Sequence, residues 1–125
     1  MLNVVIENSG NVAVLRCSGR LVAGEEAWTL FSTAVSLKEK RVLLLDLTRV
    51  SRTDARGLGV LVFLKLWAST AGVKLQLVPS NAVKELLDLT GLSSELELRP
   101  SEDVQPSLGF FADQKESGIA NAADD

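Results

Sequence analysis

Histidine is absent from this sequence of 125 residues. It is the commonest general base in enzymes and the commonest metal ligand in proteins, so its absence strongly disfavours hydrolytic triads and zinc sites of the usual kinds. The sequence also lacks a phosphate-binding segment of the form G-x-x-x-x-G-K and a paired, activated nucleophile. We therefore expect a protein without catalytic residues, without a metal site and without a cofactor.

Cysteine occurs only at position 17. One cysteine cannot form a disulfide within the chain, and the apolar residues around Cys17 predict a small buried side chain. This usage fits a reducing compartment, so we expect a cytoplasmic protein. The opening residues MLNVVIENSG contain neither a basic segment nor an apolar core, so we expect no signal peptide.

Long hydrophobic runs are missing as well. The longest apolar run, residues 58–64, ends at Lys65 and is too short to cross a bilayer. The net charge of −3 at pH 7 favours solubility and gives no electrostatic reason to bind nucleic acid or an acidic membrane. We expect no nucleic acid partner and no direct membrane insertion, while docking on a membrane complex stays open.

What the sequence does contain is the composition of one soluble globular domain, with 46% hydrophobic and 23% charged residues. Residues 112–125 are rich in small residues and aspartate and predict a disordered acidic tail, which leaves residues 1–111 as the domain. Within that domain, Leu108, Phe110 and Phe111 are expected to pack back on the body or to face a partner.

The first half of the chain predicts a hairpin, a helix and a buried strand. Residues 2–7 and 11–17 are rich in branched apolar residues and flank a turn, and Gly19 is expected to break the second strand. Helical spacing of apolar positions 27–35 predicts an amphipathic helix with Trp28 at the edge of its apolar stripe. Residues 42–45 then predict a strand covered on both faces.

Asp46 follows that strand at its expected carboxyl edge, where α/β sheets tend to place ligand sites. Two interpretations stay open. Asp46 either contributes to such a site or only bonds to loop amides, as aspartate often does in turns.

The second half predicts two more helices and two more strands. Residues 58–67 are apolar around most of the helix and are expected to be largely buried. A half-exposed strand follows at 73–77, then a helix from Ser80 to a glycine cap at Gly91, and a last strand at 96–98. The order β-β-α-β-α-β-α-β predicts an α/β single domain with a mixed, mainly parallel sheet of about five strands and helices packed on it.

The segment Thr53–Ala71 passes from a polar loop into this apolar helix and is the first place to look for function. Asp54 is a candidate N-cap, and the loop at 54–57 precedes open helix amides that favour an anion or a partner's carboxylate. Gly57 and Gly59 lie in the first turn. They either allow a close approach by a ligand or only permit tight helix packing.

Three segments in this order resemble the STAS domain family, which is named for sulphate transporters and bacterial anti-sigma factor antagonists. They are CSGRL at 17–21, LLLDLTRV at 43–50 and TDARGLGVLVFL at 53–64, the last being similar to the family's D-S-S-G-L-G segment. The resemblance covers residues 3–100. It implies an α/β STAS-like domain that acts through protein–protein interaction in bacterial signalling, by partner switching that regulates transcription.

In the family, the serine after the aspartate of that segment is phosphorylated by a switch-protein kinase, and the unphosphorylated form binds this kinase and frees a sigma factor. A phosphate adds roughly two negative charges at such an interface, enough to expel a partner. The matching position here is Ala55, which has no hydroxyl, so no phosphorylation is expected there. Ser51 and Thr53 are the fallback candidates.

Two other positions depart from the family. Arg56 replaces its second small polar residue, and Val22 stands where an acidic residue often follows the second strand. Both departures count against the phosphoswitch and against a nucleotide-related role. Arg49, Arg52 and Arg56 instead form a candidate carboxylate or phosphate clamp, because each guanidinium offers a planar fork of donors. A merely solvated loop is the equal alternative.

Three functions follow from this interpretation. The first is a non-catalytic module that binds an anti-sigma factor or GHKL-type serine kinase through Arg52, Thr53, Asp54, Ala55, Arg56, Gly57 and Gly59. The second is a scaffold or accessory STAS subunit of a transporter, lipid-trafficking or signalling complex. The third is an anion- or nucleotide-sensing module. A homodimer stays open, as does whether Arg56 helps or blocks the family interface.

Overall fold

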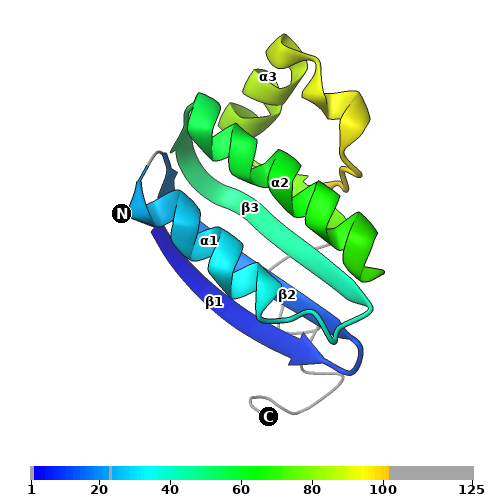
Figure 1. Cartoon of the computed structure of the whole chain (residues 1–125). Helices are drawn as coiled ribbons and strands as arrows, with labels where there is room; N and C mark the ends of the chain where they lie inside the picture. The colour runs from blue at the N-terminus through cyan, green and yellow to red at the C-terminus, as the bar shows by residue number, and fades with distance from the viewer. Residues whose placement is uncertain (1, 23, 102–125) are drawn as a thin grey trace.

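The computed structural model describes residues 2–22 and 24–101. Strands and helices alternate along this part of the chain after an opening hairpin (Figure 1). The elements are β1 (Leu2–Ser9), β2 (Val12–Leu21), α1 (Glu25–Val35), β3 (Val42–Thr53), α2 (Ala55–Ala71), β4 (Lys74–Pro79), α3 (Asn81–Thr90) and the 3-10 helix η1 (Leu92–Glu95).

The strands form one mixed sheet in the order β1-β2-β3-β4. β1 and β2 pair antiparallel, whereas β2, β3 and β4 are parallel, so the predicted mixed, mainly parallel sheet is confirmed. In place of a full strand at 96–98, the structure has one parallel bridge between Leu77 and Leu98. The Leu77 N–H donates to the carbonyl oxygen of Glu97 at 2.9 Å, and the Arg99 N–H donates to that of Leu77 at 2.7 Å.

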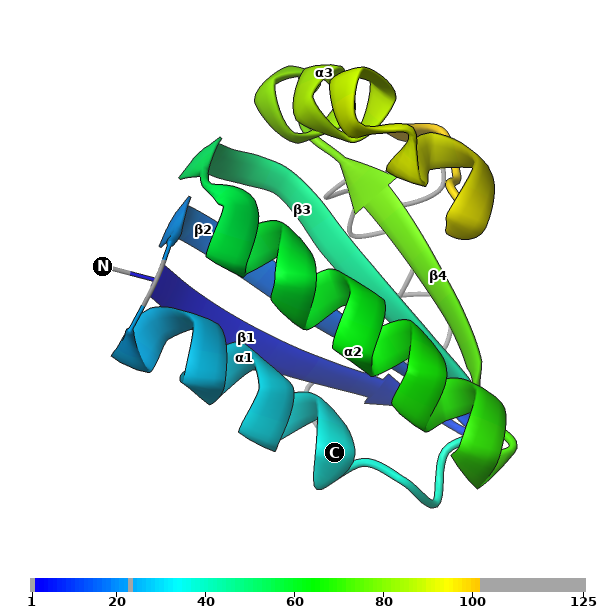
Figure 2. The ribbon, with the colours of Figure 1, turned by 45° about the horizontal axis from the view of Figure 1, so that its top comes forward.

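The helices α1 and α2 lie side by side on one face of the sheet, and α3 lies beyond the carboxyl ends of β3 and β4 (Figure 2). The main core fills the space beneath them and consists chiefly of leucine, valine and alanine side chains. All buried apolar side chains that these helices contribute belong to this core. A second, smaller cluster made of Val14, Leu44 and Val78 comes from the strands alone.

Local signals predicted both ends of α3 correctly. Ser80 caps α3, because its hydroxyl oxygen accepts a hydrogen bond from the Val83 N–H at 3.2 Å. Gly91 ends α3 in the left-handed conformation with φ 77°, which glycine adopts without strain. The expected glycine cap is therefore confirmed.

Gly19 does not break the second strand, contrary to expectation. β2 continues to Leu21, and Gly19 lies inside it with φ 107°. The pairing of β2 with β3 shifts register on both sides of this glycine, between Arg16 and Ser18 and between Gly19 and Arg20. At each shift the extra residue belongs to β3, and Gly19 lies opposite these irregularities with a positive φ that glycine adopts without strain, so β2 continues instead of ending.

The prediction that the helix at 58–67 is largely buried is wrong. α2 buries Leu58, Leu61 and Leu64, but Phe63 and Leu66 are 64% and 58% exposed. A helix laid on a sheet buries only the stripe that faces the sheet, whatever the polarity of its outer side. Trp28 lies at the edge of the apolar stripe of α1, as predicted: it is 67% exposed and stacks on Phe31 with ring centroids 5.6 Å apart.

The expectations for Leu108, Phe110, Phe111, the domain boundary after residue 111 and the tail at 112–125 fall outside the described residues. Within the described part of the chain, no helix is long and apolar enough to cross a membrane.

Candidate functional site

The site begins where β3 ends and α2 starts, next to the carboxyl end of β2 (Figure 1). Asp54 has extended backbone angles, φ −130° and ψ −175°, and its Oδ1 accepts a hydrogen bond from the Gly57 N–H at 2.8 Å. Its carbonyl oxygen accepts from the Leu58 N–H at 3.0 Å. The structure thus confirms Asp54 as the N-cap of α2.

This cap changes the electrostatics of the helix start. A helix N-terminus carries about half a positive charge, and the Asp54 carboxylate already lies against it. A second free anion at the same place would meet a like charge. The geometry therefore suits a partner that contacts several side chains better than it suits an isolated phosphate.

The two glycines of the first turn have different surroundings. Gly57 is buried, and a Cβ on it would overlap the carbonyl oxygen of Leu21 and the hydroxyl of Thr53 and lie 3.1 Å from the Leu21 carbonyl carbon. A Cβ on Gly59 would meet nothing within 4 Å. Gly57 thus lets α2 sit tightly against the end of β2, whereas no neighbour requires glycine at position 59. Their roles in a partner interface stay predictions.

Four neighbouring residues form what we call the α2 entry surface: Thr53, Asp54, Ala55 and Arg56. Ala55 and Arg56 are exposed, and Thr53 and Asp54 are half-buried. The Thr53 hydroxyl donates to the Asp54 carbonyl oxygen at 3.4 Å. Within the described part of the chain, the side chains of Ala55 and Arg56 are thus accessible to a partner protein.

The predicted arginine clamp is divided between the two sides of the sheet. In the parallel pairing, Arg49 lies opposite Ser18 and Arg52 opposite Arg20. Cys17 and Leu21 are buried in the main core, so the alternating residues Ser18 and Arg20 point to the opposite face, and their partners Arg49 and Arg52 do too. Arg56 belongs to α2, on the helix-covered side.

Arg20 is distant from these arginines in the sequence, but it lies opposite Arg52 in the sheet. Arg20, Arg49, Arg52 and Arg56 are all exposed, and none forms an ion pair with a described residue. Like charges directly opposite each other on neighbouring strands repel, so the Arg20–Arg52 pair costs stability unless an anion lies nearby. Arg20 was not predicted, because its position opposite Arg52 depends on the register shifts between β2 and β3. Anion binding by Arg49, Arg52 and Arg56 stays a prediction.

Ser51, a fallback phosphorylation candidate, is exposed between these arginines. Its hydroxyl donates to the carbonyl oxygen of Gly19 at 3.1 Å. Thr53, the other candidate, is half-buried. Ser51 and Thr53 both stay fallback candidates for phosphorylation.

Asp46 has a structural role, and the expected edge position is wrong. β3 runs on to Thr53, so Asp46 lies in mid-strand and is only 6% exposed. Its Oδ2 accepts from Arg16 Nη1 at 2.8 Å, and its Oδ1 accepts from the Thr48 N–H at 3.0 Å and the Thr48 hydroxyl at 2.6 Å. Asp46 thus bonds to an amide, as one of the two interpretations expected, but this amide lies within β3 and not in a loop, and Asp46 also pairs with Arg16.

Cys17 is buried, as the sequence predicted. Burial, with a smaller contribution from the charge of Asp46, raises the pKa of its thiol to about 12. The thiolate is the reactive form of cysteine, so Cys17 stays unreactive near neutral pH.

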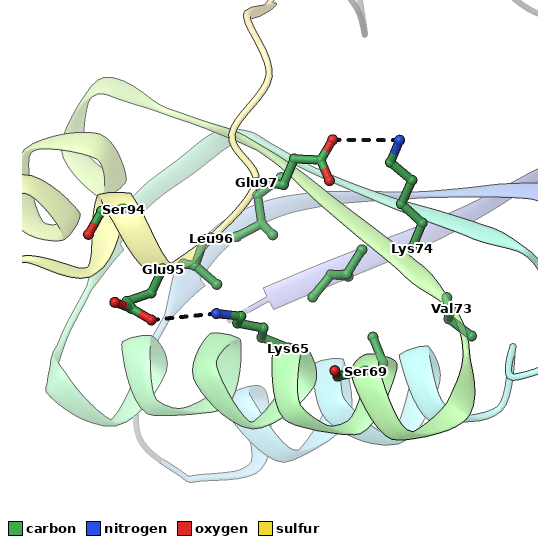
Figure 3. Close-up of a pocket in the computed structure, with 11 residues that line it drawn as sticks. Lys65, Ser69, Val73, Lys74, Ser94, Glu95, Leu96 and Glu97 are labelled. Carbon is green, nitrogen blue, oxygen red and sulfur yellow. Dashed lines mark ion pairs between the residues drawn. The ribbon is translucent and has the colours of Figure 1, made fainter.

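A cleft of about 440 Å³ lies between α2, β4 and residues 94–97 (Figure 3). Lys65 reaches across it to Glu95 with an N–O distance of 3.5 Å, and Lys74 lies 3.8 Å from Glu97. Gln76 also donates to Glu97, at 2.7 Å. The charges that line the cleft are thus paired with one another. No group of three potential metal ligands exists among the described residues.

The comparisons with known proteins agree with this fold. Residues 3–104 match the family model described as the STAS domain. An anti-sigma factor antagonist from Mycobacterium paratuberculosis is 21% identical, with a TM-score of 0.70 over 83% of this chain and 90% of that chain. No curated protein matches the sequence.

The anti-sigma factor antagonist SpoIIAA in its unphosphorylated form is 15% identical, with a TM-score of 0.66 over 87% of this chain and 98% of that chain. The Bacillus cell-fate determinant SpoIIAA in its phosphorylated form is 14% identical, with a TM-score of 0.63 over 85% of this chain and 99% of that one. At such low identity these structures show the likeness of the fold alone. The family model, by contrast, spans most of the sequence, and this chain belongs to the STAS domain family.

Proposed function

We propose that this protein is a non-catalytic interaction module that binds an anti-sigma factor or a GHKL-type serine kinase through the α2 entry surface. The single observation that carries the proposal is the exposure of Ala55 and Arg56 at the capped start of α2 in a STAS domain. The likeness of the fold to anti-sigma factor antagonists supports this class of partner.

Because residue 55 is alanine, we expect the α2 entry surface to be available to a partner at all times. SpoIIAA has been solved in phosphorylated and unphosphorylated forms, so that protein carries a phosphate switch. Ala55 offers no oxygen to which a phosphate could be transferred. The entry surface would therefore bind its partner without being switched off by phosphate at this position.

Arg56 sets the expected chemistry of the partner. Its exposed side chain follows the N-cap Asp54 by two residues, so the helix start carries one cationic and one anionic side chain. A partner surface with a carboxylate opposite Arg56 would form a bidentate pair, which is directional as well as attractive. A free anion or nucleotide is less suited, because Asp54 already occupies the positive end of α2.

The experiment is calorimetric titration of the protein with a purified anti-sigma factor and with a purified GHKL-type serine kinase, each from the organism that encodes this protein. We expect Arg56→Glu to weaken binding by about tenfold or more, as for a charged residue at the centre of an interface. Arg41→Glu makes the same charge change just before β3, at the other end of the sheet, and should leave the affinity within about twofold. Equal affinity of wild type and Arg56→Glu would remove the entry surface from the interface.

A second candidate function, an accessory subunit of a larger complex, is favoured by the exposed apolar side chains of α1 and α2. Trp28, Phe63 and Leu66 are each more than half exposed. Apolar patches of this kind often mark interaction sites. Replacing Phe63 and Leu66 by serine separates the candidates: loss of partner binding in this variant, with binding kept in Arg56→Glu, would favour the accessory role.

A further inference from the structure

The sheet has a second apolar cluster on the face away from the helices. Val14 and Val78 are fully buried and Leu44 is 6% exposed. Among the described apolar residues, only Val12 packs against them, and the described helices add nothing to the cluster. Parallel strands are normally covered on both faces, and apolar side chains at the middle of an open sheet face would remain partly accessible to water. The burial of all three side chains therefore points to a further segment over this face.

The same face carries a group of cations. Arg20, Arg49 and Arg52 point to this side at the carboxyl ends of β2 and β3, and no described acidic residue pairs with them. Closer to the cluster, Arg16 is satisfied by Asp46 at 2.8 Å and by Glu7 at 3.0 Å. The face thus combines an apolar centre with a cationic end, and whatever covers it must be apolar and acidic.

Residues 102–125 have this composition. They contain Leu108, Phe110 and Phe111, followed by a run rich in acidic residues. Six acidic residues and one lysine give this segment a net charge of −5, whereas residues 1–101 carry +2. The overall charge of −3 is thus the sum of a basic part, residues 1–101, and an acidic part, residues 102–125.

We propose that residues 102–125 dock on the helix-free face of the sheet, with Leu108, Phe110 and Phe111 over Val14, Leu44 and Val78. The acidic residues of the segment then lie toward Arg20, Arg49 and Arg52. This intramolecular docking occupies the cationic end of the sheet and makes it unavailable to other anions. The entry surface at Ala55 and Arg56 is left open, so the proposal is independent of the proposed function.

The connection is long enough for this docking. The described chain ends at Ser101, shortly after Leu98 bridges to β4, which is the strand that carries Val78. From β4 to β2 is two strand spacings, about 10 Å. The ten residues 102–111 span about 15 Å as a helix and about 33 Å when extended, so the aromatic residues reach Val14 in either form.

Nuclear Overhauser spectroscopy on the full chain tests the apolar contact. The chain has four phenylalanines, and Phe31 and Phe63 lie on α1 and α2 on the other side of the sheet. We expect cross-peaks between the methyl groups of Val14, Leu44 and Val78 and phenylalanine ring protons. They should vanish in Phe110→Leu/Phe111→Leu, which keeps apolar side chains, and persist in the control Phe63→Leu.

Three outcomes would overturn this contact: the absence of the cross-peaks in the wild type, their persistence in the double leucine variant, or their appearance only between differently labelled copies. The last result would show that a second copy of the chain covers the face. A mixed sample of labelled and unlabelled protein distinguishes the two cases.

Trypsin cleavage tests the charge contact. Lys115 is the only basic residue in residues 102–125, so cleavage there gives one defined fragment. Arg20→Glu/Arg52→Glu should repel the acidic segment and speed this cleavage by up to about fivefold for each pair that is lost, the upper range for exposed ion pairs. Lys38→Glu/Arg41→Glu makes the same charge change at two exposed positions before β3 and is the matched control. Equal cleavage rates in all three proteins would overturn the electrostatic part of the proposal.

Discussion

The first turn of α2 at Gly57 rests directly on the carbonyl group of Leu21, the last residue of β2. This contact leaves no room for a Cβ at position 57. It also packs the start of α2 against the carboxyl end of β2. Asp54, Ala55 and Arg56 therefore have a defined position relative to the sheet. A partner that binds here meets a surface that is already in place.

Gly57→Ala should destabilise the protein by about 1–3 kcal/mol, because the new methyl group overlaps backbone that cannot move aside. Gly59→Ala provides the matched control in the same turn, where a Cβ meets nothing within 4 Å. It should raise the free energy of unfolding by about 0.5–1 kcal/mol through helix propensity. Urea denaturation measures both. Equal effects of the two substitutions would contradict the packing role of Gly57.

Removing the cap at Asp54 should loosen the start of α2. Asp54→Ala deletes the acceptor of the Gly57 N–H and should cost about 0.5–2 kcal/mol in unfolding free energy. Asp54→Asn keeps an acceptor oxygen, so it should retain most of this stability while it removes the negative charge. Partner affinity in the asparagine variant then reports the charge of Asp54 alone. A loss of stability as large in Asp54→Asn as in Asp54→Ala would speak against capping.

Asp46→Ala should lower the free energy of unfolding by about 1–3 kcal/mol, because it removes the acceptor of Arg16 Nη1 and of the Thr48 N–H inside the sheet. The double variant Arg16→Leu/Asp46→Leu should lose less than the sum of its two single variants, because it removes both charges from the sheet together. Thermal and urea unfolding measure these differences. Strict additivity would show that Arg16 and Asp46 do not stabilise each other.

Cys17 should make the protein sensitive to alkaline pH. Its folded pKa of about 12 lies above its ordinary value of 9.0, so the unfolded chain releases this proton first as the pH rises. The contribution is fully present below pH 9 and falls by about 1.4 kcal/mol per pH unit between 9 and about 12. Cys17→Ala removes this part of the slope. Identical slopes in wild type and variant would contradict the raised pKa.

The order of the elements and the helix caps followed from the sequence because their signals are local. Ser80 and Gly91 mark the ends of α3 through their own backbone and side-chain chemistry, and Asp54 marks the start of α2. Apolar periodicity located the strands, since one-sided or two-sided burial leaves a visible pattern over a few residues.

The parts of the fold that depend on pairing between strands were missed. Gly19 resembled a strand end because a glycine at a bulge and a glycine at a terminus look alike in the sequence. The same register shifts allow β3 to continue beyond Asp46 and place Arg20 opposite Arg52. These features depend on the pairing of β2 with β3, which are distant in the sequence, so neither segment shows them by itself.

The sequence also did not predict which apolar side chains of α2 are exposed on its outer side. The apolar residues of α2 occur all round the helix, so the sequence alone did not distinguish buried Leu61 and Leu64 from exposed Phe63 and Leu66. Only the position of the sheet relative to the helix decides which stripe is covered. The candidate site itself, at Ala55 and Arg56, was predicted because the capped helix start is a local feature.

The most direct test of the central claim combines intact-mass spectrometry with a binding measurement, after incubation with ATP and a GHKL-type serine kinase from the organism that encodes this protein. We expect the wild type to gain no phosphate and to bind equally well before and after incubation. Ala55→Ser should gain one phosphate and then lose its affinity. A phosphate on wild-type Ser51 or Thr53 that abolishes binding would contradict the claim that this docking surface cannot be switched off.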